Sequence, residues 1–252
     1  MRILVALGGD AFLGRGKDAS VANQRRNVEQ AAGALAELAR EHEVIVTGGD
    51  GPEVGQMLEP ALRNRLPGRD VVSVLTRVVV APGDPAFDHP VPRPEPNAIA
   101  EIRSLRVLVD SGALVICAGG GIPIALDGEG TMQEVEAVID DDLTAALLAR
   151  RLDADALLML TDVEAVYRDR GGPNQRPIAS ADPAELRAIG SAESSIEPKV
   201  EAACRFAATT GRRAAIGALG DLERVARGEA GTQILAPDGE SAVAAARRLP
   251  RR

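Results

Sequence analysis

Three glycine-rich segments are the parts of this sequence whose residue types are best suited to binding a charged ligand. Their residues are Gly8, Gly9 and Asp10, then Gly48, Gly49, Asp50 and Gly51, and finally Gly119, Gly120 and Gly121. Glycine permits positive φ angles and lets backbone N–H groups approach a ligand closely. Consecutive N–H groups beside a helix N-terminus bind anions such as phosphate. One such segment is typical of a tight turn, whereas three of them favour an anion-binding site.

These glycines do not follow the commoner nucleotide-binding motifs. A P-loop around Gly16 and Lys17 requires glycine at position 11 and serine or threonine at position 18, where this chain has alanine and aspartate. No G-x-G-x-x-G segment follows an apolar strand and opens a helix, which disfavours a dinucleotide-dependent dehydrogenase. The sequence therefore indicates phosphate chemistry on a different scaffold.

The basic residues are unequally divided, with 27 arginines and only two lysines, Lys17 and Lys199. Lys199 follows Pro198 at the start of a helical pattern, where the helix dipole disfavours a cation. A compact ammonium binds phosphate as a point charge, a role that arginine does not simply replace. We therefore expect Lys199 to be functional rather than a solvated residue. Lys17 lies in a Gly-Lys-Asp turn and is either solvated or part of a lid.

Three consecutive aspartates, Asp140, Asp141 and Asp142, precede a helical pattern. One interpretation is a helix start, in which carboxylates cap the N-terminus and interact favourably with the helix dipole. The other is a Mg²⁺ site at Asp140 and Asp141, helped by Asp10 and Asp50, because this ion prefers oxygen ligands. Asp10 and Asp50 are also ordinary turn residues beside glycine. The sequence leaves both interpretations open.

The composition of the 252 residues disfavours several classes of protein. A net charge of −8 and an aromatic content of 2% argue against a nucleic-acid binder, which needs a basic patch and stacking side chains. No apolar run approaches the length of a membrane span, and no cleavable signal peptide is recognisable. Cys117 and Cys204 lack metal-ligand spacing, which favours a reducing, cytoplasmic compartment.

Short apolar runs alternate with helical patterns and must position these residues. Strands are expected at residues 3–7, 44–47, 71–80, 114–118, 156–161, 213–216 and 232–235, and helices at 23–40, 98–109, 142–152 and 199–209. The proline-rich residues 81–96 are expected to form an extended loop. Continuous apolar strands between helices predict an α/β fold, a three-layer α/β/α sandwich with a mostly parallel central sheet. Ligands of such sheets lie beyond the carboxyl ends of the strands.

Seven segments, taken together with their order and spacing, resemble the carbamate kinase branch of the amino acid kinase superfamily along nearly the whole chain. They cover residues 6–11, 48–55, 119–123, 137–143, 160–163, 198–203 and 231–232. The resemblance implies a single domain over residues 1–252. Its residues 1–127 would bind the acceptor and residues 128–252 the nucleotide, with a soft boundary at 127–131. It also implies a homodimer that binds ATP or ADP with Mg²⁺.

The resemblance further implies roles for single residues. Lys199 would contact phosphates as a catalytic residue, and Asp142 would organise the site and orient this lysine. The glycine segments would hold the acceptor and the transferred phosphoryl group. The residues expected near the nucleotide are Thr161, Asp162, Val163, Tyr167 and Lys199.

The chain departs from the family pattern near this expected site. Asp10 and Asp50 stand where the family has asparagine, Gly48 where it has histidine, and Asp141 where it has lysine between two aspartates. The family's lid subdomain after the proline-rich loop, with its lysine, is missing, and so is a stretch between residues 56 and 66. Two of the three expected lysines are therefore absent. Loss of one electrostatic donor lowers a rate about 10²–10³-fold, so these changes bear on activity.

Two functions from different classes follow. The first is a carbamate kinase-like phosphotransferase that moves a phosphoryl group between ATP and a carbamate or other small carboxylate-like acceptor. In it, Mg²⁺ held by the aspartates would replace the missing lysines as a charge clamp. The alternative is a catalytically altered family member that acts as a ligand-binding or regulatory protein, or as an enzyme that does not use ATP. Both have small molecules, rather than nucleic acid or membrane, as partners.

Overall fold

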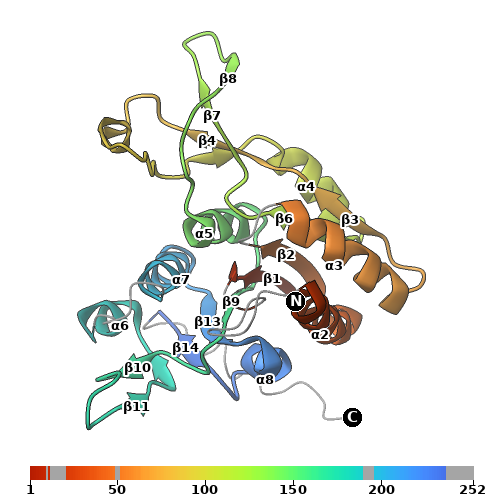
Figure 1. Cartoon of the computed structure of the whole chain (residues 1–252), viewed down its shortest axis with the longest axis vertical. Helices are drawn as coiled ribbons and strands as arrows, with labels where there is room; N and C mark the ends of the chain where they lie inside the picture. The colour runs from red at the N-terminus through yellow and green to blue at the C-terminus, as the bar shows by residue number, and fades with distance from the viewer. Residues whose placement is uncertain (10, 12–20, 49–51, 190–195, 237–252) are drawn as a thin grey trace.

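The computed structural model of the protein describes residues 1–9, 11, 21–48, 52–189 and 196–236 (Figure 1). Its described residues form an eight-stranded sheet in the order β12-β14-β13-β9-β1-β2-β6-β3. In that order the strands are Ser180–Ala181, Thr232–Ile234, Arg213–Ala218, Ala156–Thr161, Arg2–Leu7, Glu43–Gly48, Leu114–Ala118 and Val71–Val74. All neighbouring strands are parallel except β13 and β14. The prediction of a mostly parallel central sheet is therefore confirmed.

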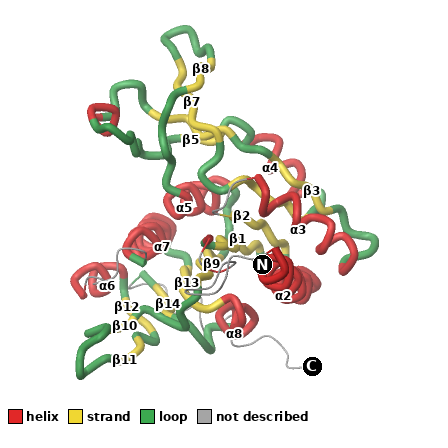
Figure 2. The backbone as a smooth tube through the Cα atoms, in the orientation of Figure 1, coloured by secondary structure: helices red, strands yellow, loops and turns green. Residues whose placement is uncertain are grey.

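Helices cover both faces of this sheet (Figures 1 and 2). One face carries α2 (Val21–Glu41), α3 (Pro52–Arg65) and α8 (Leu222–Ala226), and the other carries α4 (Ile102–Asp110), α5 (Asp141–Arg151) and α7 (Glu197–Thr210). Side chains of β1 alternate between the two cores, with Val5 in the first core and Leu4 and Ala6 in the second. Each face thus buries its own apolar core, which confirms the three-layer α/β/α sandwich.

The expected single strand at residues 71–80 is wrong, because this apolar run is divided between two sheets. β3 belongs to the central sheet, whereas β4 (Arg77–Val80) belongs to a second sheet with the order β5-β4-β7-β8. The buried Thr76 lies at the crossing, where its carbonyl accepts the N–H of Ile122 at 2.9 Å. Apolar residues on both sides of the crossing leave no turn signal in the sequence.

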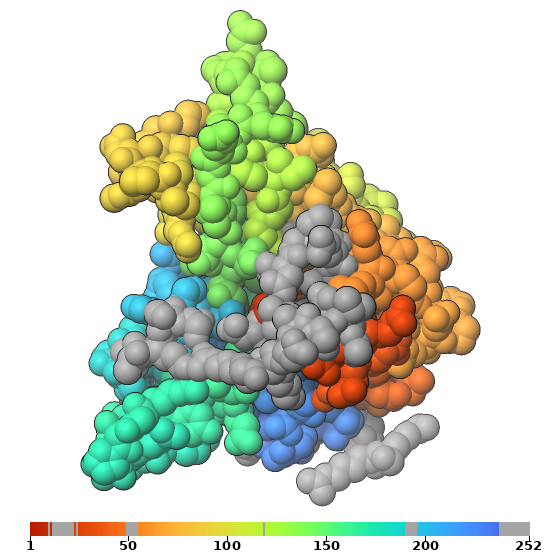
Figure 3. All heavy atoms as spheres, in the orientation of Figure 1, coloured from red at the N-terminus to blue at the C-terminus, as the bar shows by residue number. Residues whose placement is uncertain are grey.

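The second sheet projects from the central body (Figure 3). Its other strands are β5 (Ala98–Ile99), β7 (Ile122–Leu126) and β8 (Met132–Glu134). The helix expected at residues 98–109 therefore begins later, as α4. The proline-rich residues 81–96 form the expected loop, apart from the 3-10 helix η1 (Pro85–Asp88). The segment at 127–131 is the turn of the β7-β8 hairpin, in which the Asp127 carboxylate accepts the N–H groups of Glu129 and Thr131.

Smaller elements complete the described chain. They are the paired strands β10 (Tyr167–Arg168) and β11 (Arg176–Pro177), helix α6 (Pro183–Ile189) beside α7, and the 3-10 helix η2 (Leu219–Asp221). Within the described ranges, no helix is long and apolar enough to cross a membrane. Cys117 and Cys204 are free and buried, and burial raises the pKa of the Cys117 thiol to about 12 and that of Cys204 to about 11. Both thiols stay protonated at neutral pH, so neither is a reactive nucleophile.

Candidate functional site

A cavity of about 200 Å³ lies where β1 and β2 end, beside the first turns of α5 and α7. Its lining combines glycine, acidic and basic residues: Ala6, Leu7, Gly8, Gly9, Thr47, Gly48, Arg93, Val138, Ile139, Asp140, Asp141, Asp142, Pro198 and Lys199. The carboxyl ends of parallel strands meet at one sheet edge, which is the common place for ligands in such folds. The cavity therefore brings the first two glycine segments together with the aspartates and Lys199.

Lys199 reaches this cavity from the first turn of α7. Its side chain is buried, with 7% of the residue exposed, and Nζ lies 3.1 and 3.2 Å from the two carboxylate oxygens of Asp142. Asp142 comes from the first turn of α5, so the packing of α5 against α7 fixes this pair. A buried ammonium needs such a counter-ion, because burial of an unpaired charge is strongly unfavourable. The Asp142 carboxylate therefore fixes the Lys199 ammonium at the wall of the cavity.

Gly8 lies directly against this lysine. A Cβ atom at position 8 would stand 3.1 Å from both Cε and Nζ of Lys199 and 3.2 Å from the Leu160 carbonyl oxygen. The N–H of Gly8 donates to that carbonyl at 3.0 Å, so this N–H is not a donor for a ligand. Gly8 instead serves by having no side chain, which lets the ammonium approach the end of β1.

The three aspartates point to three different partners. Asp140 caps α5, since its carboxylate accepts the N–H of Leu143 at 2.8 Å. Asp141 accepts the N–H of Gly120, and burial raises the pKa of its carboxyl from 3.8 to about 7, with the charges of Asp142 and Asp140 acting in the same direction. Asp142 pairs with Lys199. The helix-start interpretation therefore describes the geometry of Asp140, and the first-turn positions suit all three carboxylates.

A magnesium ion does not fit these aspartates as a metal centre of their own. Among the described residues, no group of three His, Cys, Asp or Glu side chains is arranged to hold a metal ion. The carboxylates of Asp140 and Asp141 are directed at backbone N–H groups rather than at a common point.

The third glycine segment packs behind the cavity rather than lining it. A Cβ at Gly119 would meet the Gly48 carbonyl oxygen, and a Cβ at Gly120 would lie 2.7 Å from Oδ1 of Asp141. Gly121 has a φ of +65° in the left-handed region, which favours glycine. These glycines are thus required by close packing, and the N–H of Gly120 is taken by the Asp141 carboxylate.

Of the residues expected near the nucleotide, Lys199 lines the cavity, whereas the four at the end of β9 and beyond it do not. Thr161 is buried and its hydroxyl lies 3.2 Å from Oδ1 of Asp162, while Val163 is buried in the core. Tyr167 lies in β10, with the guanidinium of Arg170 5.6 Å from its ring centre. The backbone of β9 nevertheless reaches the site, through the Gly8 to Leu160 hydrogen bond. The predicted residues Asp10, Lys17, Gly49, Asp50 and Gly51 lie outside the described residues.

Two lining residues, Thr47 and Arg93, are not predicted by the sequence reasoning. Thr47 is 2% exposed, and its hydroxyl has no hydrogen-bond partner in the described part of the chain. Its position between an apolar run and a glycine segment is the only signal of its role. Arg93 lies between two prolines of the long loop, and no local pattern tells where such a loop crosses the body.

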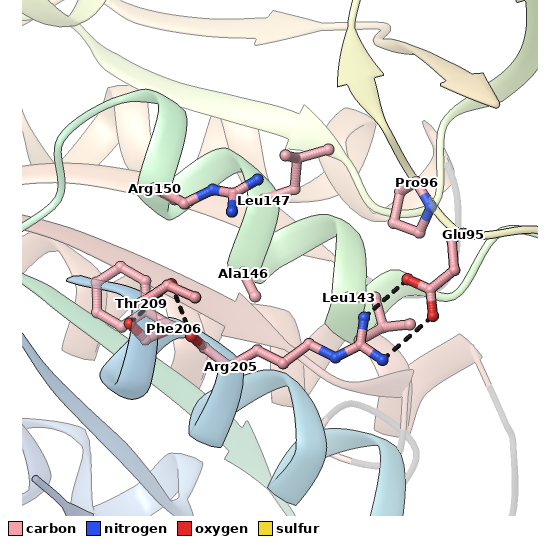
Figure 4. A pocket seen from close by; sticks show the side chains of 9 residues that line it. All are labelled: Glu95, Pro96, Leu143, Ala146, Leu147, Arg150, Arg205, Phe206 and Thr209. Carbon is pink, nitrogen blue, oxygen red and sulfur yellow. Dashed lines mark hydrogen bonds and ion pairs between the residues drawn. The ribbon is translucent and has the colours of Figure 1, made fainter. Parts of the chain in front are cut away.

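A second cavity of about 130 Å³ lies between α5 and α7, beneath Pro96 (Figure 4). Leu143, Leu147 and Phe206 form apolar walls there. At its edge the Arg205 guanidinium makes two contacts with the Glu95 carboxylate, at 2.8 and 3.2 Å. This ion pair ties the proline-rich loop to α7, the helix that carries Lys199.

Comparisons with known proteins agree on one family. The model of the amino acid kinase family matches residues 1–217. Carbamate kinase from Rhizobium meliloti is 38% identical, with 93% of each chain covered, and that from Haemophilus influenzae is 36% identical, with 93% of this chain and 96% of the relative covered. The solved structure of carbamate kinase from Giardia lamblia bound to AMP-PNP is similar with a TM-score of 0.87 and 27% identity, over 93% of this chain and 98% of that one.

The alignment with the Rhizobium meliloti carbamate kinase also reports on chain length. It spans 301 positions, whereas this chain has 252 residues. The relative therefore contains segments with no counterpart here.

Proposed function

The chain belongs to the amino acid kinase family and is carbamate kinase-like, and from this we propose that it transfers a phosphoryl group between ATP and a carbamate or other small carboxylate-like acceptor. In the direction that makes ATP, the P–O bond to carbamate in carbamoyl phosphate breaks and a P–O bond to ADP forms. The observation that carries the proposal is the Lys199–Asp142 pair, which holds a buried ammonium at a phosphate-sized cavity.

Phosphoryl transfer depends mainly on positioning and on neutralising charge on the transferred group. Lys199 is proposed to neutralise that charge at Nζ. Asp142 holds the ammonium in place, and Gly8 lets it lie against the end of β1. The 200 Å³ volume suits a phosphoryl group and a small acceptor, so the nucleoside of ATP is proposed to lie outside the cavity, over the C-terminal half. There it would meet Thr161, Asp162, Val163 and Tyr167.

Magnesium is proposed to be bound mainly by the phosphates of the nucleotide. It usually binds through one or two carboxylates together with phosphates and waters, rather than in a dedicated protein cage. When bound, the ion would supply charge neutralisation on the phosphates.

The test is calorimetric titration with ATP and with ADP, each with and without Mg²⁺, combined with an assay of ATP formation from carbamoyl phosphate and ADP. The proposal expects magnesium-dependent nucleotide binding and turnover. Absence of any nucleotide binding overturns it.

A second candidate function is favoured by the contact between Asp141 and the N–H of Gly120. This carboxylate takes a donor that the third glycine segment would otherwise offer to a phosphate. We therefore keep a ligand-binding or regulatory role without ATP as the second candidate. It expects binding of a small anion with no turnover, so sustained ATP formation from carbamoyl phosphate excludes it.

We also propose that the protein forms a homodimer, as the family resemblance implies. Its test is size-exclusion chromatography with light scattering, in which a mass matching a single 26.2 kDa chain contradicts it.

A further inference from the structure

We propose that Arg93 supplies the second cation of this cavity and that, together with Thr47, it binds the anionic oxygens of the small acceptor. This inference rests on the proposed function, because it assigns the ligand class of the same cavity. Among the residues that line the cavity in the described structure, Arg93 and Lys199 are the basic ones. They come from different segments, Arg93 from the proline-rich loop and Lys199 from α7.

The backbone on both sides of Arg93 is held in place. The carbonyl oxygen of Pro92 accepts the N–H of Val138 at 2.9 Å, which joins the loop to the segment leading into Asp140. On the other side, the Glu95 N–H donates to Asp84 at 3.0 Å and the Glu95 carboxylate pairs with Arg205 on α7 (Figure 4). Prolines at 92, 94 and 96 fix φ at alternate residues. Segment 92–96, which we call the strap, thus delivers Arg93 to the cavity from a fixed backbone.

Within the described part of the chain, the guanidinium of Arg93 is not committed to another group. It makes no hydrogen bond or ion pair with the residues that the structure describes, whereas Arg205 nearby is bound to both Glu95 and Glu201. A guanidinium presents a planar set of donors that matches a carboxylate or phosphate oxygen pair. Arg93 is therefore a cation held by its backbone and available to a ligand.

Thr47 gives an independent sign of a ligand at the same place. A buried hydroxyl without a partner costs about 1–3 kcal/mol, and such groups are rare in native proteins. The Thr47 hydroxyl lies in the lining of the cavity and is unpaired among the described residues. An oxygen atom of a bound anion satisfies it by accepting its hydrogen.

The charge of the lining explains why a second cation is needed. Lys199 is balanced by Asp142, and Asp140 and Asp141 add two further carboxylates to the wall. A small anion in this volume therefore meets repulsion unless a cation faces it, and Arg93 is the described group that does so. The strap is therefore proposed to provide this cation through one residue, Arg93.

The experiment compares Arg93→Ala and Arg93→Lys with Arg103→Ala, which removes an exposed guanidinium on α4 away from the cavity. Binding of inorganic phosphate and of carbamoyl phosphate is measured by calorimetry, and the KM values for carbamoyl phosphate and ADP are measured by ATP formation. We expect R93A to weaken binding of both anions about tenfold or more and to raise the KM for carbamoyl phosphate but not for ADP. R93K should retain part of the affinity, and R103A should match the unmodified protein.

Thr47→Val supplies a second arm that separates binding from folding. Because it removes an unpaired buried hydroxyl, it should leave the melting temperature of the free protein equal or higher while weakening phosphate binding about threefold or more. Equal anion affinities in R93A and R103A overturn the inference. If the unmodified protein binds phosphate without forming ATP, the proposed function fails and the R93A comparison still decides the role of Arg93. If it binds neither anion, both proposals are overturned.

Discussion

At the scale of single residues, Lys199 has an environment that favours lysine over arginine. Its ammonium fits between the Asp142 carboxylate and the glycine at position 8, where a Cβ would already stand 3.1 Å from Nζ. A planar guanidinium is larger and cannot take the same place without moving α5, α7 or the end of β1. Because 27 of the 29 basic residues are arginine, the sequence singles out the lysine at position 199. The reason why lysine is needed there comes from its contacts in the structure.

Lys199→Arg is therefore expected to keep the charge and lose the function. We expect kcat to fall about 10²–10³-fold, the effect of losing one well-placed electrostatic donor. Steady-state kinetics of ATP formation measures this, and urea unfolding monitors the fold. Arg103→Lys, on an exposed helix surface, is the matched control and should leave both unchanged. A K199R protein with full activity would contradict the point-charge role.

Asp141 carries a prediction about pH. The pKa of its carboxyl is about 7 in the folded chain and 3.8 as an unperturbed group. At pH values between these two, the unfolded chain loses the Asp141 proton while the folded chain keeps it, so the free energy of unfolding falls as pH rises. The full destabilisation caused by the buried, charged carboxylate is present above about pH 7. In the Asp141→Asn variant, the side-chain amide oxygen can still accept the N–H of Gly120, and the side chain carries no charge. It should stabilise the protein by about 1–3 kcal/mol at pH 8 and by little at pH 4.

Chemical unfolding of D141N and the unmodified protein at these two pH values measures the difference. Asp70→Asn, which changes an exposed carboxylate just before β3, provides a control for general charge effects. Equal stabilisation by D141N at pH 4 and pH 8 would contradict the buried, ionising Asp141.

At the scale of elements, the strap is held by an ion pair that contributes little to stability. Glu95 and Arg205 are both about half exposed, and such pairs are worth about 0–1 kcal/mol. Their effect is instead on the position of Arg93, two residues away. Glu95→Gln is therefore expected to raise the KM for carbamoyl phosphate about threefold or more while the free energy of unfolding changes by less than about 1 kcal/mol.

The control is Glu223→Gln, which breaks an exposed pair with Arg227 on α8, far from the strap in sequence and fold. It should change neither the KM nor the stability measurably. If E95Q and E223Q give the same KM, the ion pair does not position the strap.

Local sequence patterns predict some of the secondary-structure elements and miss others. The main strands and helices follow from apolar periodicity, because each strand is buried on both faces and each helix on one. The second sheet does not, since β5, β7 and β8 are only two to five residues long and β8 is exposed throughout. Contacts between distant residues are also not given by local patterns. The pairing of Lys199 with Asp142 follows from a family resemblance, and the position of Arg93 depends on where a proline-rich loop crosses the body of the protein. Thr47 has only its position before a glycine segment as a sequence signal, and the structure adds a buried hydroxyl that is unpaired among the described residues.

At the scale of the whole molecule, the cavity lies where the two halves of the chain meet in one sheet. β1 pairs with β2 on one side and with β9 on the other, and the N–H of Gly8 continues the second pairing to Leu160. α5 and α7, which carry Asp142 and Lys199, follow in the C-terminal half. A ligand that contacts Thr47, Arg93 and Lys199 together therefore bridges both halves.

Such bridging predicts that ligands raise the stability of the entire chain in one transition. Carbamoyl phosphate at a hundred times its Kd should add about 2.7 kcal/mol to the free energy of unfolding. For a chain of this length, that corresponds to a rise in Tm of about 5–10 °C. Differential scanning calorimetry measures it, with potassium chloride at matched ionic strength and neutral acetamide as control solutes. A shift no larger than that with potassium chloride would contradict a specific anion site. A shift confined to one of two separate transitions would contradict a cavity shared by both halves.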